Sequence, residues 1–352
     1  MRNSENTRIV FLELVRAGLW EQDVRLLPYQ DIEWQEVYRL ATEQSVLGLV
    51  LAGLEHSDVK PPQVLLLQWI GGVQMIEQRN KAMNAFVAEA IGALREQDIY
   101  ALLVKGQGIA QCYEKPLWRP SGDIDFFLSK DNYGKAVSFF KNRFSNNKDG
   151  GQYSQEYAFY TDQWMIEVHG SLRTCLSSKI DKVVDAVQKS VFYGGNVRSW
   201  DNNGTLVFLP APTEDVFLVF THFIKHFYKE GVGLRQICDW CRLLWSYRES
   251  LNYGKLGLWI TKCGLMGEWK AFYNMASRYL GMPDLDSRLM VYDSRSDKKA
   301  EKLMEFILGG YSGNKFKDTL HISKIFPWKA LRYSPSIFLN VNWMKIRERL
   351  FN

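Results

Sequence analysis

Short apolar runs bounded by turn residues are confined to the middle of the chain, and this confinement limits the fold more than any other feature. Such runs are typical of buried strands, whereas the flanking segments carry apolar residues at the spacing of amphipathic helices. Strands are predicted at 99–104, 121–128, 156–160, 164–169 and 205–209. The pattern predicts an α+β fold, with a small mixed β-sheet between a helical N-terminal and a helical C-terminal region.

The same change of pattern divides the 352 residues into three predicted parts. They are an N-terminal helical region at 1–97, an α/β core at 98–210 and a C-terminal helical domain at 211–352. Asp31 and Thr213 are predicted N-caps of the helices that follow them. Helices are further predicted at 178–190, 214–229, 234–249, 255–264 and 267–280.

The composition is that of a globular protein, with 46% apolar and 24% charged residues. It excludes a disordered tail, a collagen and a disulfide-stapled mini-protein. The net charge of +5 permits anionic partners such as nucleotides without requiring duplex nucleic acid. No segment reaches the ~18 apolar residues of a membrane span. Because the five cysteines are sparse and odd in number, and no signal peptide is recognisable, we expect reduced thiols and a cytoplasmic location.

The sequence Gly122-Asp123-Ile124-Asp125 carries the sharpest chemical signal. On a strand, residues i and i+2 point to the same face, so the two carboxylates lie side by side and repel each other unless a cation is present. Mg²⁺ prefers such oxygen ligands, and Mn²⁺ can replace it. Glu167, between two apolar residues of a later strand, is the predicted third acid. Three such carboxylates could hold two Mg²⁺ ions about 3.5–4 Å apart, and Glu167 or Asp125 could accept a hydroxyl proton.

Upstream of these acids, Lys105-Gly106-Gln107 forms a predicted turn between a strand and a helix. Backbone N–H groups at such a turn can bind phosphate oxygens, and Gly106 lets the backbone approach closely. Lys105 and Arg119 are cations suited to a triphosphate, which Arg119 can bind through two hydrogen bonds.

This order of a strand, a glycine turn, a helix, Gly-Asp-Ile-Asp and a later strand acid resembles the DNA-polymerase-β-like nucleotidyltransferase superfamily. More narrowly, the motifs are similar to those of a bacterial branch of uncharacterised nucleotidyltransferases. The motifs are Val104-Lys105-Gly106, Arg119-Pro120-Ser121-Gly122-Asp123-Ile124-Asp125 and Glu167-Val168-His169, with His222, His226, Leu234-Arg235-Gln236 and Asp239 in the helical half. Two departures are the Gly106-Gln107 turn, where Gly-Ser or Gly-Gly is usual, and a longer gap to Asp123.

The resemblance implies Mg²⁺-dependent transfer of NMP from an NTP, with ATP favoured, by a two-metal mechanism. It implies that Asp123, Asp125 and Glu167 are the metal ligands and the catalytic acids. The acceptor stays open among a small molecule, a protein side chain, a peptide and an RNA end. The predicted nucleotide-binding residues are Lys105, Gly106, Gln107, Arg119, Gly122, His169, His222 and Arg235.

Several of these residues have a structural alternative. His169 is either a phosphate contact or a structural histidine. His222 and His226 share a helix face, but the Glu of a His-Glu-x-x-His zinc motif is missing, so a nucleotide contact or a structural hydrogen bond is favoured. Arg235 and Asp239 are also four residues apart, and we expect them either to pair with each other in a structural role or to line the cleft. The basic and aromatic residues after 314 are either a surface segment or a binding site for RNA or an anionic membrane.

Two other functions fit the Asp-x-Asp sequence. A metal-dependent glycosyltransferase would use the acids to bind a nucleotide-sugar through Mn²⁺, although such enzymes place an α/β half before the motif and this chain places helices there. A catalytically silent nucleotide-binding or regulatory module is the third hypothesis. Clustered acids without a function destabilise a fold, which disfavours it.

Overall fold

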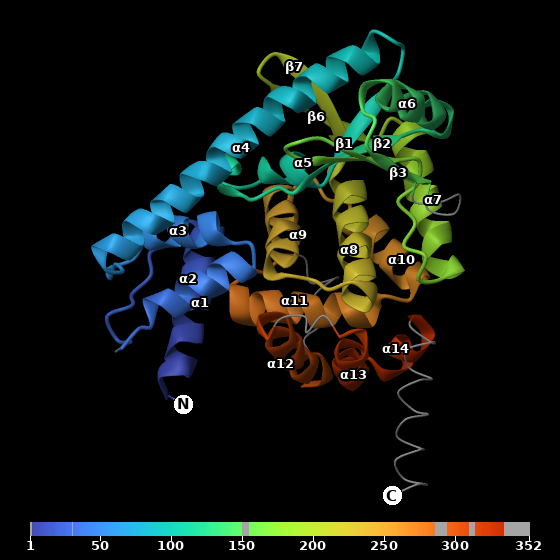
Figure 1. The fold of residues 1–352 in the computed structure, drawn as a ribbon. Helices are drawn as coiled ribbons and strands as arrows, with labels where there is room; N and C mark the ends of the chain where they lie inside the picture. The colour runs from blue at the N-terminus through green and yellow to red at the C-terminus, as the bar shows by residue number, and fades with distance from the viewer. Residues whose placement is uncertain (1, 30, 150–154, 286–293, 310–313, 334–352) are drawn as a thin grey trace, which may run out of the picture.

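The computed structural model describes residues 2–29, 31–149, 155–285, 294–309 and 314–333. A mixed sheet lies between long helices on one side and a larger helical part on the other (Figure 1). Before the sheet, the chain forms α1 (Arg2–Trp20), α2 (Trp34–Glu43), α3 (Leu47–Glu55) and α4 (Gln63–Arg95). Among the described residues, none of the helices combines the length and the apolar composition that crossing a bilayer needs.

Seven strands form one sheet in the order β3-β4-β5-β2-β1-β7-β6. They are β1 (Ala101–Val104), β2 (Asp123–Leu128), β3 (Asn147–Asp149), β4 (Glu156–Tyr160), β5 (Met165–His169), β6 (Val197–Asn202) and β7 (Thr205–Pro210). The central strand β2 runs antiparallel to β1 and parallel to β5, and β1 runs parallel to β7. The predicted α+β class and all five predicted strands are therefore confirmed.

The sequence did not predict β3 and β6, which are the two edge strands. In β6, exposed and half-buried residues alternate, so the strand lacks the apolar run by which the others were recognised. Two predicted N-caps are wrong although their helices exist. Glu33 precedes α2, and Asp31 lies two residues further upstream with φ of 54°. Thr213 lies inside α8 (Pro212–Lys229), where Pro212 opens the helix and the Thr213 hydroxyl instead accepts a hydrogen bond from the Asn252 amide.

The two faces of the sheet differ in chemistry because side chains alternate along each strand. On one face, Ile124, Phe126 and Leu128 of β2 are buried with apolar residues of α4 and α6 (Lys130–Arg143). The other face carries Asp123 and Asp125, and α7 (Ser178–Tyr193) and α8 lie on that side. The apolar alternation thus fixes which way the two acids point.

The described helices that follow α8 lie below the sheet in Figure 1. They are α9 (Leu234–Ser246), α10 (Tyr253–Cys263), α11 (Met266–Leu280), α12 (Ser294–Leu308), α13 (Lys315–Ile325) and α14 (Pro327–Tyr333). Helices α13 and α14 lie in the segment after residue 314 that the sequence offered as a binding site for RNA or a membrane. The part of that segment after residue 333 lies outside the described residues.

The predicted boundaries near residues 98 and 210 coincide with changes of secondary structure, but the apolar core does not respect them. One cluster of buried side chains extends from α1–α3 to α8–α14. Trp20 of α1 donates its indole N–H to the carbonyl oxygen of Leu280, at a distance of 2.6 Å. The N-terminal and C-terminal helices therefore share one core, and the three-domain division stays a prediction.

Helices α1 and α3 pack so closely that only glycine fits at their contact. A Cβ atom at Gly18 would collide with the carbonyl oxygen of Leu49, and one at Gly53 with that of Leu14. In α4, by contrast, nothing lies within 4 Å of the position of a Cβ atom at Gly71.

Gly18→Ala and Gly71→Ala should therefore change stability in opposite directions. We expect Gly18→Ala to lower the free energy of unfolding by about 1–3 kcal/mol, because the helices must separate. Gly71→Ala should raise it by about 0.5–1 kcal/mol, because alanine loses less backbone entropy in a helix. Urea unfolding measures both, and equal effects of the two substitutions would contradict the close packing of α1 and α3.

A candidate active site between the sheet and the C-terminal helices

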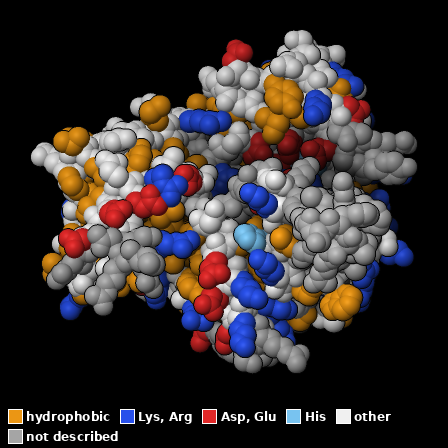
Figure 2. All heavy atoms as spheres, turned by 60° about the horizontal axis from the view of Figure 1, so that its bottom comes forward, with side chains coloured by type: hydrophobic (Ala, Val, Ile, Leu, Met, Phe, Trp, Pro, Cys, Tyr) orange, Lys and Arg blue, Asp and Glu red, His pale blue; other side chains and the backbone are white. Residues whose placement is uncertain are grey.

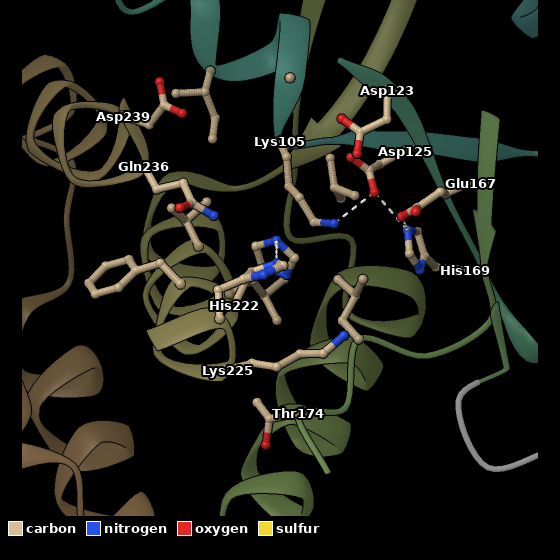
Figure 3. Close-up of a pocket in the computed structure, with 18 of the residues that line it drawn as sticks. Lys105, Asp123, Asp125, Glu167, His169, Thr174, His222, Lys225, Gln236 and Asp239 are labelled. Carbon is tan, nitrogen blue, oxygen red and sulfur yellow. Dashed lines mark hydrogen bonds and ion pairs between the residues drawn. The ribbon is translucent and has the colours of Figure 1, made fainter. Parts of the chain in front are cut away.

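The register of β2 and β5 brings the predicted acids together. Asp125 lies opposite Glu167 in this parallel pair, and Asp123 shares a face with Asp125 because the two are separated by one residue. His169 follows Glu167 by two residues and joins the same face. Figure 3 shows the four side chains gathered at one side of a cavity. The structure therefore places Glu167 next to Asp125, and the roles predicted for the three acids stay predictions.

Asp125 is the buried centre of this group. Its Oδ1 atom lies 2.7 Å from Nζ of Lys105 and 2.7 Å from Nε2 of His169. The same Nε2 lies 3.2 Å from Oε2 of Glu167, and Nδ1 of His169 lies 3.8 Å from Oε2 of Glu156. His169 therefore lies among three carboxylates, and the cross-strand pairing of Glu156 with His169 could not be recognised before the sheet was known.

The charges in the group shift one another's pKa values. Burial raises the pKa of Asp125, but the positive charge of Lys105 and the hydrogen bond from His169 outweigh it and hold this pKa far below its usual range. The negative charge of Asp125, together with burial, raises the pKa of Asp123. For Lys105 and His169, burial lowers the pKa but the neighbouring carboxylates raise it more. The carboxylates of Asp123 and Asp125 therefore repel each other, and nearby positive charge reduces this repulsion.

Lys105 is held in an unusual backbone conformation. Its φ of 58° and ψ of −145° lie in a region that is nearly restricted to glycine, and Gly106 follows with φ of 38°. Such a residue costs about 1–3 kcal/mol and persists only when its surroundings enforce it. Here the end of β1 and the start of α5 (Gly106–Ala110) turn the chain sharply and direct the Lys105 ammonium to Asp125.

The acids open into a cavity of about 330 Å³ between the sheet and helices α8 and α9. Its lining combines the acids with Lys225 of α8 and Arg235 of α9. No described residue forms an ion pair with Lys225, so its ammonium is available to an anionic ligand. In the space-filling view, a group of acidic side chains lies recessed in a hollow of the surface (Figure 2).

Arg119 lines the cavity, but its guanidinium is already engaged. Nε and NH2 donate to the two carboxylate oxygens of Asp239 at 2.9 and 2.6 Å, and NH1 donates to the hydroxyl of Ser121 at 2.7 Å. The expected pairing of Arg235 with Asp239 is wrong, because Asp239 is occupied by Arg119 and Arg235 donates instead to the carbonyl oxygen of Pro120 at 2.7 Å. Arg119 thus anchors the loop before β2 onto α9.

Two other predicted residues do not reach the cavity. The side chain of Gln107 is buried beneath α4, where Nε2 lies 2.5 Å from Sδ of Met83, so a nucleotide contact through this side chain is not supported. Gly122 is absent from the cavity lining, and its carbonyl oxygen accepts a hydrogen bond from Arg79. Gly106, His169, His222 and Arg235 all line the cavity.

The residues present suit a divalent cation. Ligand atoms of Asp125, Glu167 and His169 lie within 4.8 Å of one another. Carboxylate oxygens are hard ligands for Mg²⁺, and an imidazole beside them widens the range to Mn²⁺. The pKa of Asp123 is raised mainly by the negative charge of Asp125, and a bound cation would offset this repulsion.

A strand with two acids, a parallel neighbour with a third, and a glycine turn beside them define a nucleotidyltransferase-like core. A family model described as an uncharacterised nucleotidyltransferase matches residues 30–266, and the chain belongs to this family. The match confirms the resemblance to uncharacterised nucleotidyltransferases, whereas the bacterial origin stays a prediction. No curated protein and no solved structure matches the chain.

The buried pair of Arg119 and Asp239 gives a prediction about stability. Arg119→Met leaves the charge of Asp239 buried, and we expect the free energy of unfolding to fall by about 3–5 kcal/mol. The double variant Arg119→Met/Asp239→Leu removes both charges and should be more stable than Arg119→Met. Urea unfolding of the three proteins measures the effect.

Arg143 provides the matched control, because its pair with Glu89 is exposed on both sides. Arg143→Met should cost less than about 1 kcal/mol. A cost equally small for Arg119→Met, accompanied by loss of NTP affinity, would show that Arg119 acts mainly on the nucleotide.

Proposed function

We propose that this protein is a Mg²⁺-dependent nucleotidyltransferase that transfers NMP from an NTP, with ATP favoured, to a hydroxyl group or similar nucleophile. One observation carries the proposal: Asp123, Asp125 and Glu167 line one cavity together with the cations Lys225 and Arg235. The family to which the chain belongs supports the same class of reaction.

Each wall of the cavity has a separate task in this proposal. Asp123, Asp125 and Glu167 hold the cation. When bound, Mg²⁺ supplies charge that neutralises phosphate oxygens and lowers the pKa of an attacking hydroxyl. Arg235 and Lys225 face the cavity from the helices and bind the anionic phosphates. Lys225 offers the point charge of its ammonium, and Arg235 offers the several N–H donors of its planar guanidinium.

Lys105 and His169 have a second role as counter-charges. Both hydrogen-bond Oδ1 of Asp125, so they balance this buried carboxylate while no cation is bound. With a cation held by the acids, Asp125 would no longer need Lys105 as its counter-charge, and the Lys105 ammonium could turn toward a phosphate. Its neighbour Gly106 begins α5, where amide N–H groups without helical partners provide further donors.

The alternatives are less well supported. A glycosyltransferase of the Asp-x-Asp type needs an α/β half before the motif, whereas helices α1–α4 and one strand precede Asp123 here. The silent module is weakened by the three acids that stay together at an open cavity. All five cysteines are free, which agrees with the reducing cytoplasm as the proposed location.

Calorimetric titration with ATP and Mg²⁺ tests the proposal. Wild-type protein should bind ATP only when Mg²⁺ is present, because the acids alone repel the phosphates. Asp123→Asn, Asp125→Asn and Glu167→Gln should each weaken this binding by at least about tenfold, since each removes a cation ligand. Asp162→Asn changes an exposed acid in the turn between β4 and β5 and should leave the affinity unchanged.

The possible outcomes separate the three functions. Absence of ATP binding in wild-type protein contradicts the proposal. Binding of a UDP-sugar in place of ATP would indicate a glycosyltransferase. ATP binding that depends on Asp123, without release of pyrophosphate for any acceptor, would indicate a silent module.

A further inference from the structure

Three polar side chains follow one another at the C-terminal end of α8, and all three line the cavity. His222, His226 and Glu230 are spaced by four residues, so they lie on one face of the helix. Nδ1 of His226 lies 2.8 Å from Oε2 of Glu230, and Nε2 of His226 lies 2.9 Å from Nε2 of His222. We call these three residues the His–His–Glu chain.

The hydrogen-bond directions in this chain follow from what each group can donate. A carboxylate only accepts, so His226 donates from Nδ1 to Glu230. A neutral His226 then has its lone pair on Nε2 and accepts from Nε2–H of His222. A neutral His222 consequently has its lone pair on Nδ1. Among the described residues, none donates to this Nδ1 atom.

The surroundings stabilise these states. The hydrogen bond from His226 lowers the pKa of Glu230 to about 2, which keeps Glu230 an acceptor. Burial and the positive charge of Lys105 lower the pKa of His222 well below its usual value, which keeps His222 neutral. The charge of Lys105 also relates His222 to the acid group, because the same ammonium holds Asp125.

The two ends of the His–His–Glu chain differ in their exposure to solvent. His222 lies in the cavity that Lys105 and the acids also line (Figure 3). The side chain of Glu230 is 52% exposed at the end of α8. The His–His–Glu chain therefore runs along the cavity wall from His222 to a carboxylate that solvent reaches.

We propose that Nδ1 of His222 accepts the proton of the attacking nucleophile, and that His226 and Glu230 are positioning residues that keep this nitrogen unprotonated. This inference rests on the proposed nucleotidyltransferase function and assigns its proton acceptor. It moves the role of proton acceptor, which the sequence suggested for Glu167 or Asp125, to His222, because the proposed function uses both carboxylates to hold the cation.

The step is balanced in protons and electrons. The nucleophile's O–H bond breaks as its oxygen forms a bond to the α-phosphorus, and the proton moves to Nδ1 of His222. The bond between the α-phosphorus and the bridging oxygen breaks, and its electron pair leaves with pyrophosphate. His222 then passes its Nε2 proton to His226, whose Nδ1 proton moves to Glu230 and from there to water.

Nitrogen NMR of the histidine side chains tests the hydrogen-bond directions in the wild-type protein, without any reaction. At about pH 8, above the ordinary imidazole pKa of about 6.5, we expect His226 to carry its proton on Nδ1 and His222 on Nε2. The protein has five histidines, so the signals of His222 and His226 are assigned by their loss in His222→Gln and His226→Gln. A His222 with its proton on Nδ1 overturns the inference.

Steady-state kinetics tests the catalytic role, with ATP and Mg²⁺ as substrate and water in place of the unidentified acceptor. His222→Gln should lower kcat for AMP formation by about 100-fold or more and leave KM for ATP within about threefold. Glu230→Ala should lower kcat by about tenfold and mix the two tautomers of His226, a change that a merely structural role would not produce. Glu249→Ala, which removes a 90% exposed acid far from this step, is the matched control and should leave kcat unchanged.

Failure of this inference differs from failure of the proposed function. Unchanged kcat in His222→Gln, with ATP binding lost in Asp123→Asn, overturns the role of His222 and leaves the nucleotidyltransferase standing. Wild-type protein that shows the expected tautomers but binds no ATP overturns the proposed function instead, and the catalytic role of His222 with it.

Discussion

The carboxylate of Asp125, which is almost fully buried, is the constraint on which the rest of the site depends. A buried charge is tolerated only when it is paired and hydrogen-bonded, and here Lys105 and His169 both donate to the same oxygen. The strained turn at Lys105 delivers one of these donors, and the register of β2 with β5 delivers the other. Backbone strain, strand order and side-chain charge are thus linked through a single atom.

The same arrangement explains how one cavity can hold opposite charges. Asp123, Asp125 and Glu167 lie on the sheet, where alternation along β2 and β5 sets them on one face, whereas Lys225 and Arg235 lie on helices of the C-terminal part of the chain. The bond network of Arg119 fixes the distance between these two walls, because it joins the loop before β2 to Asp239 on α9. A cavity walled in this way suits a ligand that carries negative charge together with a cation.

Much of this was predictable from local sequence pattern. The strands with apolar runs and the shared face of Asp123 and Asp125 follow from a period of two residues, and Glu167 was recognised as an acid between buried neighbours. The edge strands were missed because most of their side chains are exposed, so they lack the apolar residues by which buried strands are recognised. The partner of Arg119 lies 120 residues away, and the placement of His169 among three acids depends on strand order, so neither is encoded in spacing along the chain. Glu230 and Lys225 carried no motif at all.

The shared core of the first and last helices also governs how the molecule can be made. Helix α1 leaves the ribosome while α11, which supplies the carbonyl partner of Trp20, lies 260 residues from that indole and is still untranslated. Helix α3 is made early and can cover part of α1, but the side of α1 that packs on α11 stays exposed through most of synthesis, when such surfaces are prone to aggregate. The helical layer can therefore pack completely only late in synthesis. The cavity wall opposite the acids is completed at the same stage.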